Sequence, residues 1–279
     1  MPRVEVTEAF AGIDLAFRKG KRLPVSLCVW HKDHFVPLAV RMPGTPCPPR
    51  GAGNAASLIP STVSNFAAET ATYLRNLEQY FGVRISGIAI DAPSGPRASD
   101  LKRRRAEQAL DERGISCFAT PSAKEFAEIR RKAAAHLSAG GSESQLPHAN
   151  QLWMLVGFAL FKRLRKDWEC LEVFPQATVH ALGASAIHKS KPGGVLAQLK
   201  AIAQRTGWPE PISECSLKLA AYGPAHDALD AYMSAWVAGL PSEERAALGV
   251  PPDDAIWIPL VSPKSHPGIL SLSARASSL

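Results

Sequence analysis

The sequence is poor in cysteine, and the arrangement of its cysteines argues against two common kinds of small fold. Its 279 residues contain five cysteines, an odd number, and no two of them form a Cys-x-x-Cys pair. Disulfide frameworks need paired cysteines and structural zinc sites need closely spaced ones, so neither is expected. Thiols persist in a reducing compartment, and we therefore expect a cytoplasmic protein.

Long hydrophobic runs are also absent. The longest apolar run covers residues 152–161, which is about half the length that a helix needs to cross a bilayer. The amino terminus carries Glu5 and Glu8 where a secretion signal requires an apolar core. We therefore expect a soluble protein that neither spans a membrane nor is secreted.

Glycine-rich phosphate loops are missing as well. The sequence contains no Gly-x-Gly-x-x-Gly motif and no Walker motif. The glycine pair at residues 193–194 is typical of a turn that enters a helix, because no Gly-Lys-Ser/Thr follows to complete a phosphate loop. Neither of the common loops that cradle a nucleotide phosphate is predicted.

What the sequence does contain is an ordinary apolar fraction and an excess of basic residues. Hydrophobic residues make up 46% of the chain and charged residues 20%, values typical of a folded globular protein. The net charge of +7 favours a polyanionic partner such as nucleic acid. Lysine and arginine gather within residues 102–105, 130–132 and 162–166.

The first third of the chain predicts a small sheet. Apolar stretches at residues 9–17, 25–30 and 35–40 have short connections, so we expect three antiparallel strands. Pro37 predicts that the third strand lies at the sheet edge, because proline cannot donate to a ladder. A helix is expected over residues 61–80, and a strand buried on both faces over residues 85–91.

The remaining pattern is mainly helical. Further helices are expected at residues 99–113, 122–137, 149–166, 194–205 and 224–240; a strand at 170–174; and a late strand or packed extended segment at 255–258. The sequence therefore predicts an α/β fold with a mixed five-stranded sheet, three antiparallel strands followed by α/β units, flanked by helices. We expect one domain over residues 1–260, with a helical insertion at about 97–168 between strands four and five, and a loose tail at 261–279.

Carboxylates interrupt three of the apolar strands. Asp14 lies between Ile13 and Leu15, Asp91 closes the fourth predicted strand, and Glu172 lies inside the fifth. Taken singly, an acid at a strand end often caps a turn. An unpaired buried charge costs several kcal/mol, so each of these carboxylates needs a partner or a cation.

The predicted helix at residues 224–240 supplies two more acids. Apolar residues recur along it at spacings of three and four, which predicts a buried face made of Leu229, Tyr232, Met233, Trp236, Val237 and Leu240. Asp230 lies on the flank of that face, with Asp227 one turn earlier on the same side. Compensation of the helix dipole could account for an acid at Asp227, in the first turn of the helix. Asp230 is already in the second turn, where that effect fades.

Several carboxylates brought to one point require a bound cation. Two unit charges 4 Å apart repel by roughly 4 kcal/mol at an effective dielectric constant of 20. Oxygen ligands select hard ions, so Mg²⁺ or Mn²⁺ is the expected occupant. A pair of such ions can activate a water molecule and stabilise the leaving oxygen of a phosphodiester, which makes nuclease chemistry the leading hypothesis.

Four short motifs carry a family resemblance. They are GIDLA at residues 12–16, IDAPSGP at 90–96, EVFP at 172–175 and HDALDA at 226–231. In this order they resemble domain-of-unknown-function family 429, which is described as predicted RNase H-like nucleases. The similarity extends over about residues 10–240. The late His-Asp-x-x-Asp spacing is most similar to the RuvC-type Holliday-junction resolvase branch of the RNase H-like superfamily.

The resemblance implies roles for individual residues. Asp14, Asp91 and Asp230 would be the catalytic, metal-binding acids, with Asp227 as a fourth ligand. Glu172 matches a family motif and is expected to line the site, and two roles stay open for it there: binding metal or hydrogen-bonding to neighbouring backbone. The large helical insertion departs from a minimal RNase H core, so the resemblance implies no particular substrate.

Four further residues could have a role in the site because of their positions in the sequence. His226 could orient a carboxylate or a water molecule, although histidine is also common at helix starts. Arg97 follows Asp91 closely in a turn where a substrate phosphate could lie. Lys102 and Arg103 could bind phosphate too, although charge runs on helices are more often solvated faces.

Two alternatives to a nuclease of DNA or RNA stay open. One is a catalytically silent module on the same scaffold that binds nucleic acid or another partner. The other is an actin-like or sugar-kinase-like ATPase, whose related fold also opens with a Gly-Ile-Asp strand. The ATPase hypothesis requires glycine-rich loops after the first and fourth strands, and residues 18–21 and 93–96 fill those places poorly.

Overall fold

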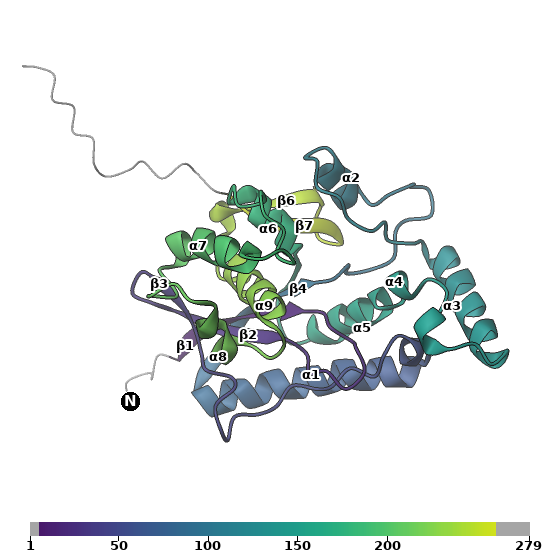
Figure 1. Cartoon of the computed structure of the whole chain (residues 1–279), viewed down its shortest axis with the longest axis horizontal. Helices are drawn as coiled ribbons and strands as arrows, with labels where there is room; N and C mark the ends of the chain where they lie inside the picture. Colours follow the sequence, from purple (N-terminus) through teal and green to yellow (C-terminus); the bar gives the residue numbers. More distant parts are fainter. Residues whose placement is uncertain (1–5, 261–279) are drawn as a thin grey trace, which may run out of the picture.

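A five-stranded mixed sheet forms the centre of the protein (Figure 1). The structure is a computed structural model that describes residues 6–260, so the tail predicted at 261–279 lies outside the described residues. The strands follow one another across the sheet in the order β3-β2-β1-β4-β5. Their bounds are β1 Thr7–Asp14, β2 Val25–His31, β3 His34–Pro37, β4 Val83–Asp91 and β5 Cys170–Glu172.

The strand directions confirm the predicted fold class. β1 to β3 pair antiparallel, whereas β4 runs parallel to β1 and β5 runs parallel to β4. β3 lies at the edge of the sheet and ends at Pro37, as the proline predicts. The predictions for β1 and β3 ran three residues too far, because β1 loses its neighbour where β4 ends and β3 stops at its proline.

Helices cover both faces of the sheet. On one face, α1 (Pro60–Phe81) packs against α5 (Met154–Leu164) over Ile13, Ile88 and other apolar residues. On the other face lies α9 (Ala225–Ala238), with α7 (Gly194–Thr206) packed against it. Because side chains alternate along a strand, Ile13 faces α1 and α5, while Asp14 faces α9.

The closeness of α9 to the sheet depends on Gly12 in β1. A Cβ atom at this position would lie 2.0 Å from the carbonyl oxygen of Ala231 and 2.2 Å from the nitrogen of Ala235, both in the backbone of α9. Glycine is therefore the residue that allows the helix axis to approach this strand so closely. This approach places the middle of α9 directly over the carboxyl end of β1.

A set of helices between β4 and β5 forms the insertion. Its helices are α2 (Arg105–Asp111), α3 (Ala123–Ser138), α4 (Ala149–Leu152) and α5, with a 3-10 turn at Glu143–Gln145. The first helix is shorter than the predicted 99–113, because Arg104 is in an extended conformation and the helix begins only at Arg105. Within residues 6–260, no helix is long and apolar enough to cross a membrane.

A second, two-stranded sheet packs beside the insertion. It pairs β6 (Arg245–Val250) with β7 (Asp254–Pro259), and β6 lies against α2 (Figure 1). The sequence predicted a late strand or a packed extended segment at 255–258, which is the strand β7, and missed its partner strand β6. The remaining elements are α6 (Pro175–Ala181), α8 (Leu217–Ala220) and 3-10 turns at Ala55–Leu58, Glu214–Ser216 and Ser242–Glu244.

Candidate metal centre

Two of the predicted acids lie side by side at the carboxyl ends of neighbouring strands. Asp14 is the last residue of β1 and Asp91 the last residue of β4, and the two are direct partners in the parallel register. Gly12 of β1 and Gly87 of β4 both face α9. Asp14 follows Gly12 in β1, and Asp91 follows Gly87 in β4, each by an even number of residues. Strand alternation therefore directs both carboxylates to the α9 side of the sheet.

Asp230 reaches the same point from α9. One carboxylate oxygen from each of Asp14, Asp91 and Asp230 lies within 4.8 Å of the others. Asp230 is only 1% exposed, and α9 holds it there because Gly12 lets the helix lie against β1. Three segments far apart in the sequence thus bring their acids together, and oxygen ligands in such a cluster suit a hard divalent cation.

The two oxygens of Asp230 have different surroundings. Its Oδ2 accepts a hydrogen bond from the Lys189 ammonium, which reaches in from the segment between α6 and α7. Its Oδ1 is buried and has no hydrogen-bond partner among the described residues. A buried carboxylate oxygen without a partner is costly, and a bound cation would satisfy it. The donor set therefore fits Mg²⁺ or Mn²⁺.

The electrostatics of the strand acids also indicate a site that needs positive charge. Burial raises the pKa of Asp14 well above its usual range, and the neighbouring charges of Asp91 and Asp227 raise it further. Burial raises the pKa of Asp91 to about 7; Lys189 opposes this shift and Glu172 adds to it. Both carboxyl groups resist ionisation here because the single Lys189 ammonium does not balance them.

The remaining acid of the helix, Asp227, lies at the margin of the cluster. Its side chain is about a quarter exposed at 24%, and its Oδ1 lies 3.0 Å from Nε2 of the exposed His226. Burial raises the pKa of Asp227, while His226 and Lys189 oppose that shift. Asp227 thus influences Asp14 by its charge but does not belong to the close group of three.

Glu172 is tied to the protein rather than directed at the three acids. Its two oxygens accept hydrogen bonds from Arg104, at 2.7 Å each, and one of them also accepts the backbone N–H of Ser94 at 2.8 Å. Burial raises the pKa of Glu172, and Arg104 and Ser94 oppose the rise. Of the two roles left open by the sequence, the structure shows the backbone hydrogen bond: Glu172 holds the turn that follows Asp91.

The network around Glu172 extends to the second sheet. Nε of Arg104 donates to Asp254 of β7 at 3.2 Å, and the other oxygen of Asp254 accepts the backbone N–H of Arg105 at 2.8 Å. A single buried arginine therefore links β5, the start of α2 and β7. This network gives the turn after Asp91 a fixed position.

The arginines proposed for phosphate binding already have acidic partners. Arg97 is largely buried and forms an ion pair with Glu125. Arg103 lies 3.1 Å from Asp111, whereas Lys102 is exposed and no ion pair joins it to the described residues. A phosphate role for Arg97 or Arg103 requires these pairs to open, so that role stays a prediction.

Lys189 and Arg104 are the two functional side chains that sequence reasoning did not single out. Lys189 lies in a loop with no periodic pattern, 41 residues from its partner Asp230. Arg104 was one member of a basic run at 102–105, where nothing in the sequence distinguishes the buried arginine from its more exposed neighbours. The sequence did indicate that some cationic partner exists for Glu172, because a carboxylate in an apolar strand requires one.

The metal-free protein is expected to lose stability as the pH rises from about 4 to about 7. Asp91 releases its proton near its usual pKa of 3.8 in the unfolded chain but near 7 in the folded one. Over this window the folded state binds more protons, so the free energy of unfolding falls with pH. A shift of this size corresponds to a loss on the order of 4 kcal/mol.

Urea denaturation in the presence of a chelator, at several pH values between 4.5 and 7.5, measures this effect. The Asp91→Asn variant should show a flatter dependence than the wild type, because asparagine has no proton to release. Identical pH dependence in the two proteins would contradict this account of the buried acids.

The fold and a comparison with known proteins identify the family to which the chain belongs. The sheet order and strand directions define an RNase H-like α/β fold, with three acids gathered at the ends of β1 and β4 and on α9. The family model described as a protein of unknown function (DUF429) matches residues 28–255, and the chain belongs to this family. The matched span contains Asp91 and Asp230 and begins after Asp14. No curated protein and no solved structure gives a significant match to the chain.

Proposed function

We propose that this protein is a divalent-metal-dependent nuclease that hydrolyses phosphodiester bonds in DNA or RNA. The observation that carries the proposal is the meeting of Asp14, Asp91 and Asp230, together with the unpartnered buried Oδ1 of Asp230. An acidic cluster of this kind is destabilising unless a cation occupies it, and a fold gains nothing from maintaining it empty. The basic net charge of +7 supports a polyanionic substrate.

The roles of the residues follow from their positions. Asp14, Asp91 and Asp230 would hold Mg²⁺ or Mn²⁺, with Asp227 at the margin. When bound, the cation lowers the pKa of a water molecule and stabilises the charge that develops on the phosphoryl oxygens and the leaving oxygen. Lys189 neutralises Asp230 in the absence of a cation.

The reaction itself is a hydrolysis. A water oxygen forms a bond to phosphorus while the bond from phosphorus to one sugar oxygen breaks, and the leaving oxygen takes up a proton. The partly exposed Asp227, whose Oδ1 lies 3.0 Å from Nε2 of His226, would accept the proton that the attacking water releases. His226 thereby acts as a positioning residue for Asp227.

A cleavage assay tests the proposal. The purified chain is incubated with single-stranded, duplex and junction substrates of DNA and RNA, with Mg²⁺, with Mn²⁺ or with a chelator. We expect cleavage of at least one substrate class that requires a divalent cation. Binding without cleavage in every condition would contradict the nuclease and favour a catalytically silent binding module, whereas ATP hydrolysis would favour the ATPase alternative.

The cellular setting follows from the thiols. All five cysteines are free, and Cys47 and Cys215 are exposed. Exposed thiols persist in a reducing compartment, so we place the proposed activity in the cytoplasm.

A further inference from the structure

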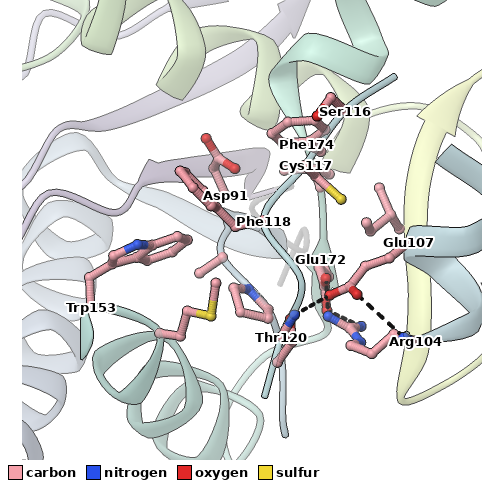
Figure 2. A pocket seen from close by; sticks show the side chains of 15 residues that line it. Asp91, Arg104, Glu107, Ser116, Cys117, Phe118, Thr120, Trp153, Glu172 and Phe174 are labelled. Carbon is pink, nitrogen blue, oxygen red and sulfur yellow. Dashed lines mark hydrogen bonds and ion pairs between the residues drawn. The ribbon is translucent and has the colours of Figure 1, made fainter. Parts of the chain in front are cut away.

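A cavity of about 290 Å³ opens beside the carboxylate cluster. Asp91 belongs both to the cluster and to the wall of this cavity, so the two spaces adjoin. The rest of the wall comes from the turn after β4, from the insertion, from β5 and the two residues after it, and from the second sheet. Figure 2 shows the side chains that line it. Pockets for small molecules usually measure about 300–1,000 Å³, so this one is of a size for a single ring system.

Aromatic side chains stand around the cavity. Figure 2 shows Trp153 at the left of the view and Phe174 near its upper centre, with Asp91 and Phe118 between them. The indole of Trp153 is fixed, because its Nε1 donates to the carbonyl oxygen of Asn150 at 2.8 Å. Phe118 is 62% exposed, the largest exposed fraction among the large hydrophobic residues of the described chain. An aromatic ring left this open at a rim is suited to stack on a flat ligand.

Apart from Asp91, which belongs to the carboxylate cluster, the charged side chains in the wall already have partners. Arg104 pairs with Glu172, and Glu107 accepts the backbone N–H of Thr120 at 2.8 Å. Among the described residues that form this wall, no cation is left to bind a phosphate, so the occupant that fits is flat and uncharged. The adjoining cluster, by contrast, is the part of the protein suited to hold a phosphate through bound metal.

We propose that this cavity binds one unstacked nucleobase of the substrate strand while a neighbouring phosphate lies at the carboxylate cluster. The inference rests on the proposed nuclease function and specifies its substrate: a nucleic acid with an unpaired or extruded nucleotide next to the scissile bond. Bases outside a duplex are commonly recognised by stacking on aromatic side chains, and enzymes that act on extruded bases enclose them in such pockets. Fully paired duplex should therefore be a poor substrate.

The test uses a short single-stranded oligonucleotide that carries the fluorescent base 2-aminopurine at one position. Stacking on an aromatic ring quenches this fluorescence. All proteins carry Asp14→Asn in the presence of Mg²⁺, so that binding is measured without cleavage; Asp14 does not line the cavity. We expect saturable quenching, and Phe118→Ala should weaken binding about ten-fold, the loss typical of one stacked base.

Two controls make the result specific. Tyr80→Ala removes an aromatic residue that is also exposed, at 49%, but lies on α1 outside the cavity, so its affinity should stay unchanged. An oligonucleotide with an abasic residue in place of the 2-aminopurine, measured by its competition with the fluorescent strand, should bind about ten-fold more weakly to the protein that retains Phe118. The Phe118→Ala variant should bind the abasic strand and the 2-aminopurine strand with equal affinity, because the contact between the ring and the base is already lost.

The outcomes separate the two proposals. Equal affinities for Phe118→Ala and Tyr80→Ala, or full affinity for the abasic strand, would overturn the base pocket even if the wild type cleaves. Quenching that depends on Phe118, in a protein whose wild type never cleaves, would retain the pocket and overturn the nuclease. Failure of the oligonucleotide to bind would overturn the base pocket, and together with absence of cleavage by the wild type it would overturn both.

Discussion

The Asp14→Asn variant is expected to lose metal-dependent cleavage by a factor of about 10²–10³ or more. Asparagine has nearly the same shape as aspartate but no negative charge, so the cluster keeps its packing and loses one anionic ligand. Losses of this size are typical when one group that stabilises the charge of a transition state is removed. The initial rate of cleavage at saturating Mg²⁺ measures the effect.

The same substitution should have the opposite effect on stability. Burial and the charges of Asp91 and Asp227 hold the pKa of Asp14 well above its usual range, so removing its ionisable group relieves an unfavourable interaction. The metal-free variant should therefore unfold at an equal or higher temperature than the wild type, as expected where function is maintained at the expense of stability. An unfolding temperature that is unchanged or higher, together with lost cleavage, would show that the substitution removes the metal site and leaves the fold intact.

Asp33→Asn is the matched control for Asp14→Asn. Asp33 is exposed in the turn between β2 and β3, away from the cluster. Its removal changes the net charge of the protein by the same amount, so cleavage by this variant should stay within a few-fold of the wild type. Asp14→Asn activity equal to that of Asp33→Asn would contradict the assignment of Asp14 to the site.

The Gly12→Ala variant is expected to lose at least about 3 kcal/mol of unfolding free energy. Inserting atoms into a packed interior commonly costs about 1–3 kcal/mol when side chains can move aside. Here the new methyl group would meet backbone atoms of Ala231 and Ala235 at 2.0 and 2.2 Å, and backbone in the middle of a buried helix cannot rotate away. The helix must shift outward, which also withdraws Asp230 from Asp14 and Asp91.

Gly87→Ala provides the comparison for Gly12→Ala. Gly87 faces the same helix from the adjoining strand β4, but its added Cβ would lie 3.4 Å from the carbonyl oxygen of Ala238, an ordinary contact. Urea denaturation should show a change of less than about 1 kcal/mol for Gly87→Ala. If Gly12→Ala is as stable as Gly87→Ala, the close approach of α9 does not depend on this glycine.

The parts of the site that lie on regular elements could be predicted from the sequence. Asp14 and Asp91 interrupt or end apolar strands, and Asp230 borders a clear apolar helical face, so periodicity alone placed each of them on its element. The parallel pairing of β1 with β4 then brings the strand acids together, because the carboxyl ends of parallel strands meet at one edge. The pairing of β1 with β4 and the close approach of α9, which Gly12 permits, required the structure.

The partners of the acids could not be predicted in the same way. Lys189 binds Asp230 from an irregular loop, and Arg104 binds Glu172 across 68 residues of sequence. Such pairs depend on how separate elements dock, and neither residue stands at a position that periodicity distinguishes. For Glu172, the structure shows one of the two roles that the sequence left open: it anchors the turn after Asp91 through the backbone N–H of Ser94.

The second sheet was missed for a related reason. Its first strand, β6, includes two alanines and a glycine and lacks the alternation of a half-buried strand. It becomes a strand because β7 pairs with it along its length and α2 covers it. Tertiary contacts here override a weak local preference, so the sequence indicated only the more apolar β7.

Binding of Mn²⁺ to the purified chain tests the central claim most directly, because it depends on no choice of nucleic acid. Calorimetric titration at pH 7.5 should show Mn²⁺ binding to the wild type and to Asp33→Asn. It should show affinity at least about 100-fold weaker, or no binding, for Asp14→Asn and for Asp230→Asn, since each removes a ligand charge from the cluster. Absence of binding to the wild type, or equal affinity in all four proteins, would contradict the proposal that these carboxylates form a metal centre.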